Sequence, residues 1–243
     1  MFEKFKSPTL FFSGGRDSLA TLLFLRPYWH EITVAWSNSG ASPQSMVDYM
    51  ASIAARVPNF VELRGNQPAW IRANGWPVDV VPVESTAANH GAVVRTIQFA
   101  PRTSCCGANM WEPLQRYIQT NRPTLVITGQ RLDEVLRNRQ RDGEFTKSTD
   151  GVTYWNPINA WDETQVMAYL REQGEPLPPG YADGATKSVD CWNCTAYVEH
   201  NAERYASMQR NEPEKWEQIH SVLRELGERL RIESKPLFDL IGA

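Results

Sequence analysis

The chain has 243 residues, 42% of them hydrophobic, and its formal net charge is −3 at pH 7. This length suits one large domain, or one domain with a helical appendage, and the charge excludes a global positive field that would attract nucleic acid or a membrane. No stretch approaches the roughly 18 apolar residues of a membrane span, and the opening MFEKFKSPTL lacks the apolar core of a secretory signal. We therefore expect a cytoplasmic protein with reduced thiols and no membrane partner.

The first part of the chain is predicted to form a strand, a helix and a second strand. Residues 8–12 (PTLFF) and 31–36 (EITVAW) are typical of short buried strands. Residues 18–26 between them form a helix with an apolar side of Leu19, Leu22, Leu23 and Leu25. A strand–helix–strand unit implies a parallel sheet with helices on both faces. We therefore predict an α/β fold with a Rossmann-like parallel sheet.

The middle of the chain continues this alternation. The patterns predict further helices at 44–56, 112–120 and 162–173, and further strands at 60–63, 78–83 and 124–129. Asp162 is suited to cap the last of these helices at its N-terminus.

The composition changes from Asn201 onward. Apolar residues recur there at helical spacing, and they are Trp216, Ile219, Leu223, Leu226 and Leu230. This spacing predicts an amphipathic helix that packs on the sheet or on a second subunit of a homodimer. We therefore divide the chain into a main α/β domain, 1–196, and a C-terminal helical extension, 197–243.

A polar turn, Ser13-Gly14-Gly15-Arg16-Asp17-Ser18, separates the first predicted strand from the first helix. A helix N-terminus presents unpaired backbone N–H groups and the positive end of the helix dipole, which together bind anions. Glycines let the backbone approach phosphate oxygens closely. The alternative is a glycine-rich turn with a capping aspartate, but its place after the first strand of an α/β pattern favours a phosphate site.

The turn has the form S-G-G-x-D-S, which resembles the PP-loop of the adenine nucleotide α-hydrolase family, the N-type ATP pyrophosphatases and their relatives. The resemblance implies that the loop holds the β,γ-pyrophosphate of ATP while a nucleophile attacks the α-phosphorus. The backbone amides of Gly14, Gly15 and Arg16, with the hydroxyls of Ser13 and Ser18, would bind pyrophosphate. Asp17 would position Mg²⁺ or the loop.

Later segments resemble the PAPS and APS reductase branch of that family, so that the resemblance covers residues 8–196. These segments are AWSNSGASPQSMVDYM, TSCCGANMWEPLQRYI, VITGQRLDEVLRNR and the stretch from NPINAW to CWNC. The first implies that Trp36, Asn38 and Gly40 border the adenosine. The third places Gly129, Arg131, Glu134 and Arg137 in the family's register.

Arginines in the third segment are expected to neutralise phosphate charge, because a guanidinium binds oxyanions in a bidentate manner. Arg131 and Arg137 are assigned to the nucleotide, and Asp17 and Arg131 are the expected catalytic residues. Arg131 follows the end of a predicted strand, where α/β sheets bind ligands. For Arg139 and Arg141 a solvated helix face or loop explains the charges equally well.

The four cysteines are Cys105, Cys106, Cys191 and Cys194. Clustered cysteines in a reducing compartment indicate metal or redox chemistry. Their layout resembles that of cluster-bearing APS reductase-like proteins, which implies a 4Fe–4S cluster held by four thiolates. Zinc is the alternative, although two adjacent cysteines do not easily face one small tetrahedral ion. The role of the cluster, redox-active or structural, stays open.

Two departures from the reductases direct the functional prediction. The tail ESKPLFDLIGA carries no further cysteine. The assimilatory reductases that this chain resembles use a cysteine thiol in their C-terminal tail as the nucleophile. The loop also keeps all of its phosphate-binding residues, which the reductases usually lose. We therefore expect ATP, cleaved at the α-phosphate with Mg²⁺ to activate a protein or nucleic-acid acceptor, as in sulfur transfer.

Two other functions remain as alternatives. One is reduction of APS or PAPS with a thiol from a partner. The other is a nucleotide-binding accessory subunit, for example of a mobile-element or CRISPR-associated system.

Overall fold

The structure is a computed structural model that describes residues 2–80, 97–133, 145–149, 151–181, 184–186, 188, 191–198 and 201–242. Its strands are β1 (Thr9–Phe12), β2 (Thr33–Asn38), β3 (Phe60–Arg64), β4 (Trp76–Val78), β5 (Phe99–Pro101), β6 (Leu125–Ile127), β7 (Phe145–Lys147) and β8 (Thr153–Trp155). Its α-helices are α1 (Arg16–Phe24), α2 (Gln44–Ala54), α3 (Gln67–Asn74), α4 (Arg102–Cys106), α5 (Glu112–Asn121), α6 (Glu163–Glu172), α7 (Ala202–Asn211) and α8 (Pro213–Ile241). A 3₁₀ turn, Arg26–Tyr28, follows α1, and a π-helical segment, Gly107–Trp111, joins α4 to α5.

Six strands form one sheet in the order β3-β2-β1-β6-β8-β7. All neighbours are parallel except β7, which pairs antiparallel with β8 at the edge. The chain moves outward from β1 to β3 and then returns to the other side of β1 with β6. The strand order therefore reverses between β1 and β6, and the loops that leave these two strands diverge there. In open α/β sheets such a switch point is where ligands bind.

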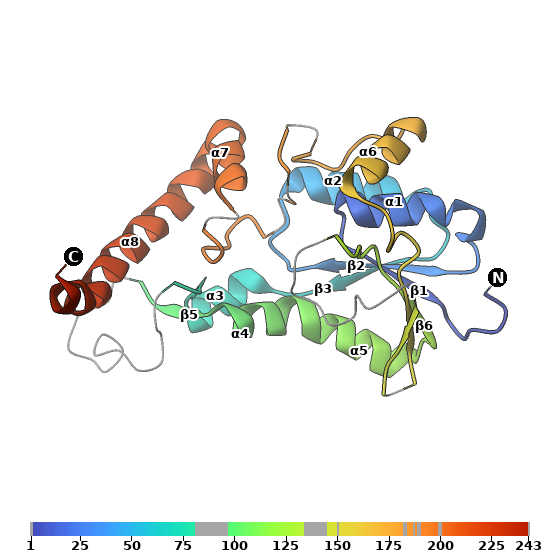
Figure 1. The fold of residues 1–243 in the computed structure, drawn as a ribbon, viewed down its shortest axis with the longest axis horizontal. Coiled ribbons are helices and arrows are strands. Elements are labelled where there is room, and N and C mark those ends of the chain that lie inside the picture. The colour runs from blue at the N-terminus through green and yellow to red at the C-terminus, as the bar shows by residue number, and fades with distance from the viewer. Residues whose placement is uncertain are drawn as a thin grey trace.

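Helices cover both faces of this sheet, with α1, α2 and α6 on one face and α5 on the other (Figure 1). The predicted apolar side of α1 lies in the main core, where Leu19, Leu22, Leu23 and Leu25 are at most 2% exposed. Asp162 caps α6 as expected, because its side chain accepts a 2.7 Å hydrogen bond from the Gln165 amide in a capping box. The predicted α/β fold with a mostly parallel, helix-flanked sheet is confirmed.

Most predicted elements lie within two residues of their expected bounds, but the strand predicted at 78–83 is wrong. The strand there is β4, which ends at Val78. Asp79 instead turns its carboxylate to the backbone N–H of Tyr197, 3.1 Å away, and to Arg102, 3.6 Å away. These contacts take the chain out of the strand, and residues 81–83 lie outside the described ranges.

The C-terminal helices form an arm beside the main sheet (Figure 1). The predicted amphipathic helix is α8, whose Val222 and Leu226 pack on Val78 and Phe99 of the two-stranded β4–β5 sheet. Ile219 of α8 packs instead on α7. The division of the chain at residue 196 stays a prediction. Among the described residues, no helix is both long and apolar enough to cross a bilayer.

Candidate functional site

The loop after β1 leads into α1 without a side-chain cap. Gly15 is the N-cap residue and makes no side-chain cap hydrogen bond, and its own amide donates to the Ser13 hydroxyl at 3.4 Å. The loop hydroxyls bind the loop itself, because Ser13 donates to the Ser18 hydroxyl at 3.1 Å and Ser18 donates to the Gly15 carbonyl at 2.9 Å. The helix N-terminus therefore faces the switch point, and the positive end of its dipole favours an anion there.

Two glycines allow close packing around this loop. Gly14 has φ +81°, a conformation that side-chain-bearing residues rarely adopt. Gly129, in the loop after β6, lies so close to α1 that a Cβ there would be 2.8 Å from the carbonyl carbon and oxygen of Asp17. A side chain at Gly129 would force the two loops apart. The requirement for glycine at position 129 is therefore explained by the close packing of the two loops at the switch point.

Asp17 and Arg131, the two expected catalytic residues, form an ion pair across the switch point. The Nε atom of Arg131 is 3.0 Å from Oδ1 of Asp17. Nη1 of Arg131 also donates to both carboxylate oxygens of Asp133, at 2.6 and 2.7 Å. The Arg131 side chain is only 4% exposed, whereas that of Asp17 is 20% exposed. Arg131 therefore lies in the interior, where it holds the Asp17 carboxylate, and Asp17 is the residue of this pair that reaches the surface.

A cavity of about 300 Å³ opens at this point. Its described lining residues are Phe11, Ser13, Gly15, Asp17, Ser18, Thr128, Gly129, Gln130, Tyr181 and Ser188. None of these is a lysine or arginine. The side chain of Arg16 turns away to Glu163 of α6, at 2.7 Å, and lies 5.6 Å from the ring centre of Tyr181. Within the described residues, attraction of an anion therefore depends on backbone amides, hydroxyls and the helix dipole.

The residues expected to border the adenosine lie at the end of β2. Asn38 is 3% exposed, and its Oδ1 accepts hydrogen bonds from the Gly40 amide at 2.8 Å and from Ser42 Oγ at 3.1 Å. Its Nδ2 donates to Glu62 at 2.5 Å. Trp36 is 3% exposed, and its Nε1 has no hydrogen-bond partner in the described part of the chain. Asn38 thus shapes the loop, and its polar atoms are occupied by protein groups.

Cys105 and Cys106 end the short helix α4. Cys105 is 2% exposed, and burial raises its pKa from the usual 9 to about 11. Burial also raises the pKa of Cys106. Negative charge on Cys194 would raise the pKa of both thiols further, so these three sulfurs lie within electrostatic reach of one another. The structure therefore brings together cysteines from the two motifs.

The second cysteine motif lies in the loop before α7. Cys191 has φ +55°, and the Cys194 amide donates to the Cys191 carbonyl at 2.9 Å. Arg204 of α7 donates to the Cys191 and Cys194 carbonyls at 2.8 and 2.6 Å, and the Tyr205 hydroxyl donates to the latter at 2.9 Å. The backbone of the motif is thus fixed from α7.

The loop after β2 is linked directly to the second cysteine motif and, through Gln67 of α3, to the first. The backbone N–H of Trp192, between the two later cysteines, donates to the Ala41 carbonyl at 3.2 Å. On the other side, the N–H of Gln67 donates to the Ser39 carbonyl at 2.9 Å, and the side chain of Gln67 reaches Cys105. The expected adenosine-bordering loop is therefore connected to both halves of the cysteine site.

Within the described ranges, no three Cys, His, Asp or Glu side chains are arranged to hold a metal ion. The chemistry of the donors still fits a thiolate-bound group. Four cysteines supply the ligands that a 4Fe–4S cluster requires, and Cys105 accepts an N–H hydrogen bond of the kind that tunes such clusters.

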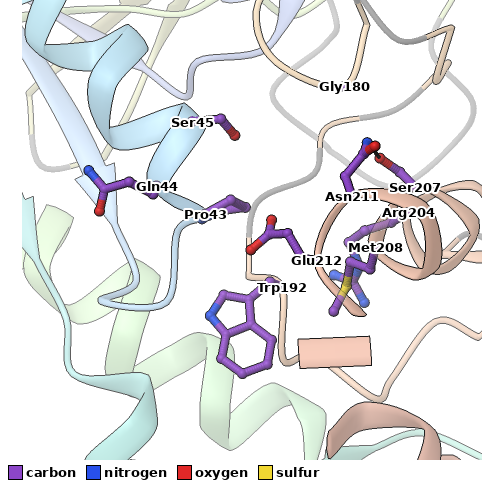
Figure 2. Close-up of a pocket in the computed structure, with 10 residues that line it drawn as sticks. All are labelled: Pro43, Gln44, Ser45, Gly180, Trp192, Arg204, Ser207, Met208, Asn211 and Glu212. Atoms are coloured by element: carbon purple, nitrogen blue, oxygen red, sulfur yellow. Dashed lines mark hydrogen bonds between the residues drawn. The ribbon is translucent and has the colours of Figure 1, made fainter. Parts of the chain in front are cut away.

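A second, larger cavity of about 500 Å³ lies between α2 and α7 (Figure 2). Pro43, Gln44 and Ser45 at the start of α2 face Trp192, Arg204 and Met208 across it. Gly180 also lines this cavity, while its neighbour Tyr181 lines the cavity at the switch point. The segment 180–181 therefore lies between the two spaces.

Several residues at the site were not predicted from the sequence. Tyr181, Thr128 and Gln130 line the cavity at the switch point, and Asp133 holds Arg131. The position of Thr128 and Gln130 beside Gly129 was the available signal, because loops that leave parallel strands carry ligand contacts. Tyr181 offered no such signal, since it lies in an irregular segment far along the chain. Of the predicted residues, Glu134, Arg137, Arg139 and Arg141 lie outside the described residues.

Comparison with known proteins places this geometry in a family. The domain model described as "Phosphoadenosine phosphosulfate reductase domain" matches residues 7–197. The adenosine 5′-phosphosulfate reductase of Deinococcus radiodurans is 30% identical over 118 residues, which cover 47% of this chain and 45% of that protein. An uncharacterized protein of Methanocaldococcus jannaschii is 25% identical over 94% of this chain and 44% of its own length. The chain thus spans less than half the length of these relatives.

A solved structure shows the same fold. The phosphoadenylyl-sulfate reductase of Candida auris, in a phosphate complex, has a TM-score of 0.53 at 16% identity, over 77% of this chain and 84% of that one. The family match covers most of the chain, and the sheet order and the loop after β1 are consistent with it. The chain belongs to the phosphoadenosine phosphosulfate reductase domain family.

Proposed function

We propose that this protein binds ATP with its β- and γ-phosphates on the Ser13–Ser18 loop and cleaves it between the α- and β-phosphorus. The observation that carries the proposal is the uncapped N-terminus of α1, which opens on a cavity of about 300 Å³ where the strand order reverses. Free amides at a helix N-terminus are donors for phosphate oxygens. The loop also retains both hydroxyl groups that its family pattern would direct at the pyrophosphate.

The charge of the site supports a nucleotide that arrives with Mg²⁺. The described lining of the cavity contains one carboxylate, Asp17, and no lysine or arginine. Carboxylate oxygens are ligands that Mg²⁺ prefers, and a magnesium-bound triphosphate carries less negative charge. Asp17 is oriented by Arg131, so its carboxylate is held at the cavity wall.

The proposed reaction is a displacement at the α-phosphorus. An oxygen of an acceptor, or of water, forms a bond to the α-phosphorus while the bond from that phosphorus to the β-phosphate oxygen breaks. Pyrophosphate leaves, and the product is an adenylylated acceptor or AMP. Catalysis of this kind depends mainly on positioning and on stabilising charge. A protein or nucleic-acid acceptor would be activated for replacement of its oxygen, as in sulfur transfer.

We further propose that Cys105, Cys106, Cys191 and Cys194 hold a 4Fe–4S cluster, with zinc as the alternative. The four thiols and the polar groups around Cys105 support this. When bound, the cluster would supply either one-electron chemistry or a covalent link between helix α4 and the loop before α7.

A second candidate function is reduction of APS or PAPS to sulfite. It is favoured by the relatives that are named adenosine 5′-phosphosulfate reductase. Such a reaction consumes two thiol hydrogens, so that sulfite, the adenosine phosphate and a disulfide are formed. The thiols would come from a partner chain, because the four cysteines of this chain are assigned to the cluster.

One set of assays separates these functions. Purified protein is incubated with ATP and Mg²⁺, and pyrophosphate is measured; in parallel it receives APS or PAPS with thioredoxin, and sulfite is measured. Pyrophosphate that disappears in Asp17→Asn, but not in the exposed α5 control Gln119→Ala, supports the first proposal. Sulfite alone supports the second, and nucleotide binding with neither product indicates an accessory subunit.

A further inference from the structure

Two buried carboxamides converge on the sulfur of Cys105. Nε2 of Gln67 donates to Sγ at 3.4 Å, and Nδ2 of Asn109 approaches the same Sγ at 3.9 Å. All three side chains are buried, with Cys105 2% exposed and the two amides 3% exposed. Each buried amide must find partners for its N–H groups, because unsatisfied donors are costly.

These amides are held in place by the segments that carry them. Asn109 belongs to the π-helical segment, where its Nδ2 also donates to the Cys105 carbonyl at 3.0 Å and its Oδ1 accepts from the Asn66 amide at 2.9 Å. Gly65 packs so closely that a Cβ there would be 2.4 Å from the Asn109 carbonyl oxygen. Isolated π-helical turns are frequent at functional sites. The loop after β3 is therefore locked against the helix that carries Cys105.

Gln67 has no structural hydrogen bond that would compete with this contact. Within the described residues, its Oε1 has no partner, and its side chain makes one hydrogen bond, to Cys105 Sγ. A neutral thiol is a weak acceptor, whereas a metal-bound sulfur carries negative charge and is a good one. The side-chain N–H groups of Gln67 and Asn109 are therefore better suited to a metal-bound sulfur than to a free thiol.

We propose that Gln67, supported by Asn109, is a positioning residue of the cysteine site that donates an N–H···S hydrogen bond to Cys105 when this residue binds the iron–sulfur cluster. The inference rests on the proposed cluster and is independent of ATP cleavage. Such a bond stabilises the reduced cluster most, because reduction adds negative charge to the sulfurs. It also restrains the ligand in the geometry that retains iron.

The test compares Gln67→Met and Gln67→Glu with wild type and with Gln119→Met, an exposed glutamine on α5. Methionine keeps the length of the side chain without a donor, and glutamate keeps its shape but has an acceptor in place of the N–H₂ group. Protein purified without oxygen is analysed for iron and sulfide, for its visible spectrum and for its melting temperature. The reduction potential of the cluster and the rate of iron release to a chelator are then measured.

The proposal expects a more negative reduction potential in both Gln67 variants and iron release that is roughly 10-fold faster. Gln119→Met keeps both wild-type values. A cluster with wild-type potential and wild-type iron release in folded Gln67→Met and Gln67→Glu overturns the inference and leaves the cluster intact. If wild-type protein contains no iron, both the cluster and this inference are overturned. Pyrophosphate release is measured in a separate assay, so the proposal of ATP cleavage is tested independently.

Discussion

Asp17 and Arg131 come from opposite sides of the reversal in strand order, and their side chains meet at 3.0 Å. Asp17 follows β1 in the first turn of α1, and Arg131 follows β6. The buried guanidinium is shared with Asp133, so that two carboxylates balance one cation. Of the three, Asp17 is the member in the cavity lining, and the Asp17–Arg131 pair thus joins the loop after β1 to the segment that follows β6.

Replacement of Asp17 by alanine is expected to abolish ATP turnover and to lower the free energy of unfolding. The buried Arg131 would lose one charged partner and keep Asp133, and breaking a buried ion pair by removing one partner costs about 3 kcal/mol. Pyrophosphate release and urea denaturation measure the two effects. Unchanged turnover in the folded variant would remove Asp17 from the site.

Gly129→Ala is expected to weaken nucleotide binding and to destabilise the fold by about 2 kcal/mol. The added Cβ would be 2.8 Å from the backbone of Asp17, and neither backbone can yield without moving a loop. Gly227→Ala in α8 is the control, because nothing lies within 4 Å of its Cβ and alanine favours the helix by up to about 1 kcal/mol. Thermal denaturation should show opposite shifts, and equal shifts would contradict the packing role.

Asn38→Ala should destabilise the loop after β2. The change leaves the Gly40 amide and the Glu62 carboxylate without the side chain that binds both, at a cost of about 2 kcal/mol. Denaturant titration measures this loss, and a nucleotide titration should show weaker binding. Asn74→Ala, at an exposed position of α3, removes a bond to its own helix at Trp70, so its effect should stay within about 0.5 kcal/mol. Two variants of equal stability would refute the role of Asn38.

Stability of the metal-free, reduced protein should fall between pH 9 and 11 because of Cys105. Burial raises the pKa of this thiol from 9 to about 11, so in that range the unfolded chain loses a proton that the folded chain keeps. Stability is therefore lost as pH rises, by about 2–3 kcal/mol in all. Cys105→Ser should show a shallower decline in denaturation experiments at the two ends of this range. Parallel curves for the two proteins would be inconsistent with a buried neutral thiol.

Local sequence patterns were sufficient to predict those elements of the fold that depend on residues close together in the chain. The apolar runs on both sides of Ser13–Ser18 predict a strand, a turn and a helix, and Asp162 predicts an N-cap that the structure contains. The strand at 78–83 failed because Asp79 finds partners in Arg102 and Tyr197, and such distant partners leave no trace in a local hydrophobic run.

The same contrast between local patterns and distant contacts applies to the candidate site. The loop after β1 follows from its glycines and its place after a strand, whereas the pairing of Arg131 with Asp17 depends on β6 lying next to β1. Tyr181 reaches the cavity from an irregular segment without a motif. Nothing in the local sequence distinguishes Gln67, and only the fold places it next to Cys105, 38 positions later in the chain.

The direct neighbourhood of β1 and β6 has a consequence for how the molecule is made. Thr9 pairs with Val126, so more than a hundred residues must be synthesised before the two strands can meet. Contacts of such long sequence separation form late and slowly, because a large loop must first be closed. A nascent or truncated chain that ends before β6 lacks Thr128, Gly129 and Gln130 of the cavity at the switch point. If the proposed function is correct, nucleotide affinity should therefore appear only after the chain has folded through β6.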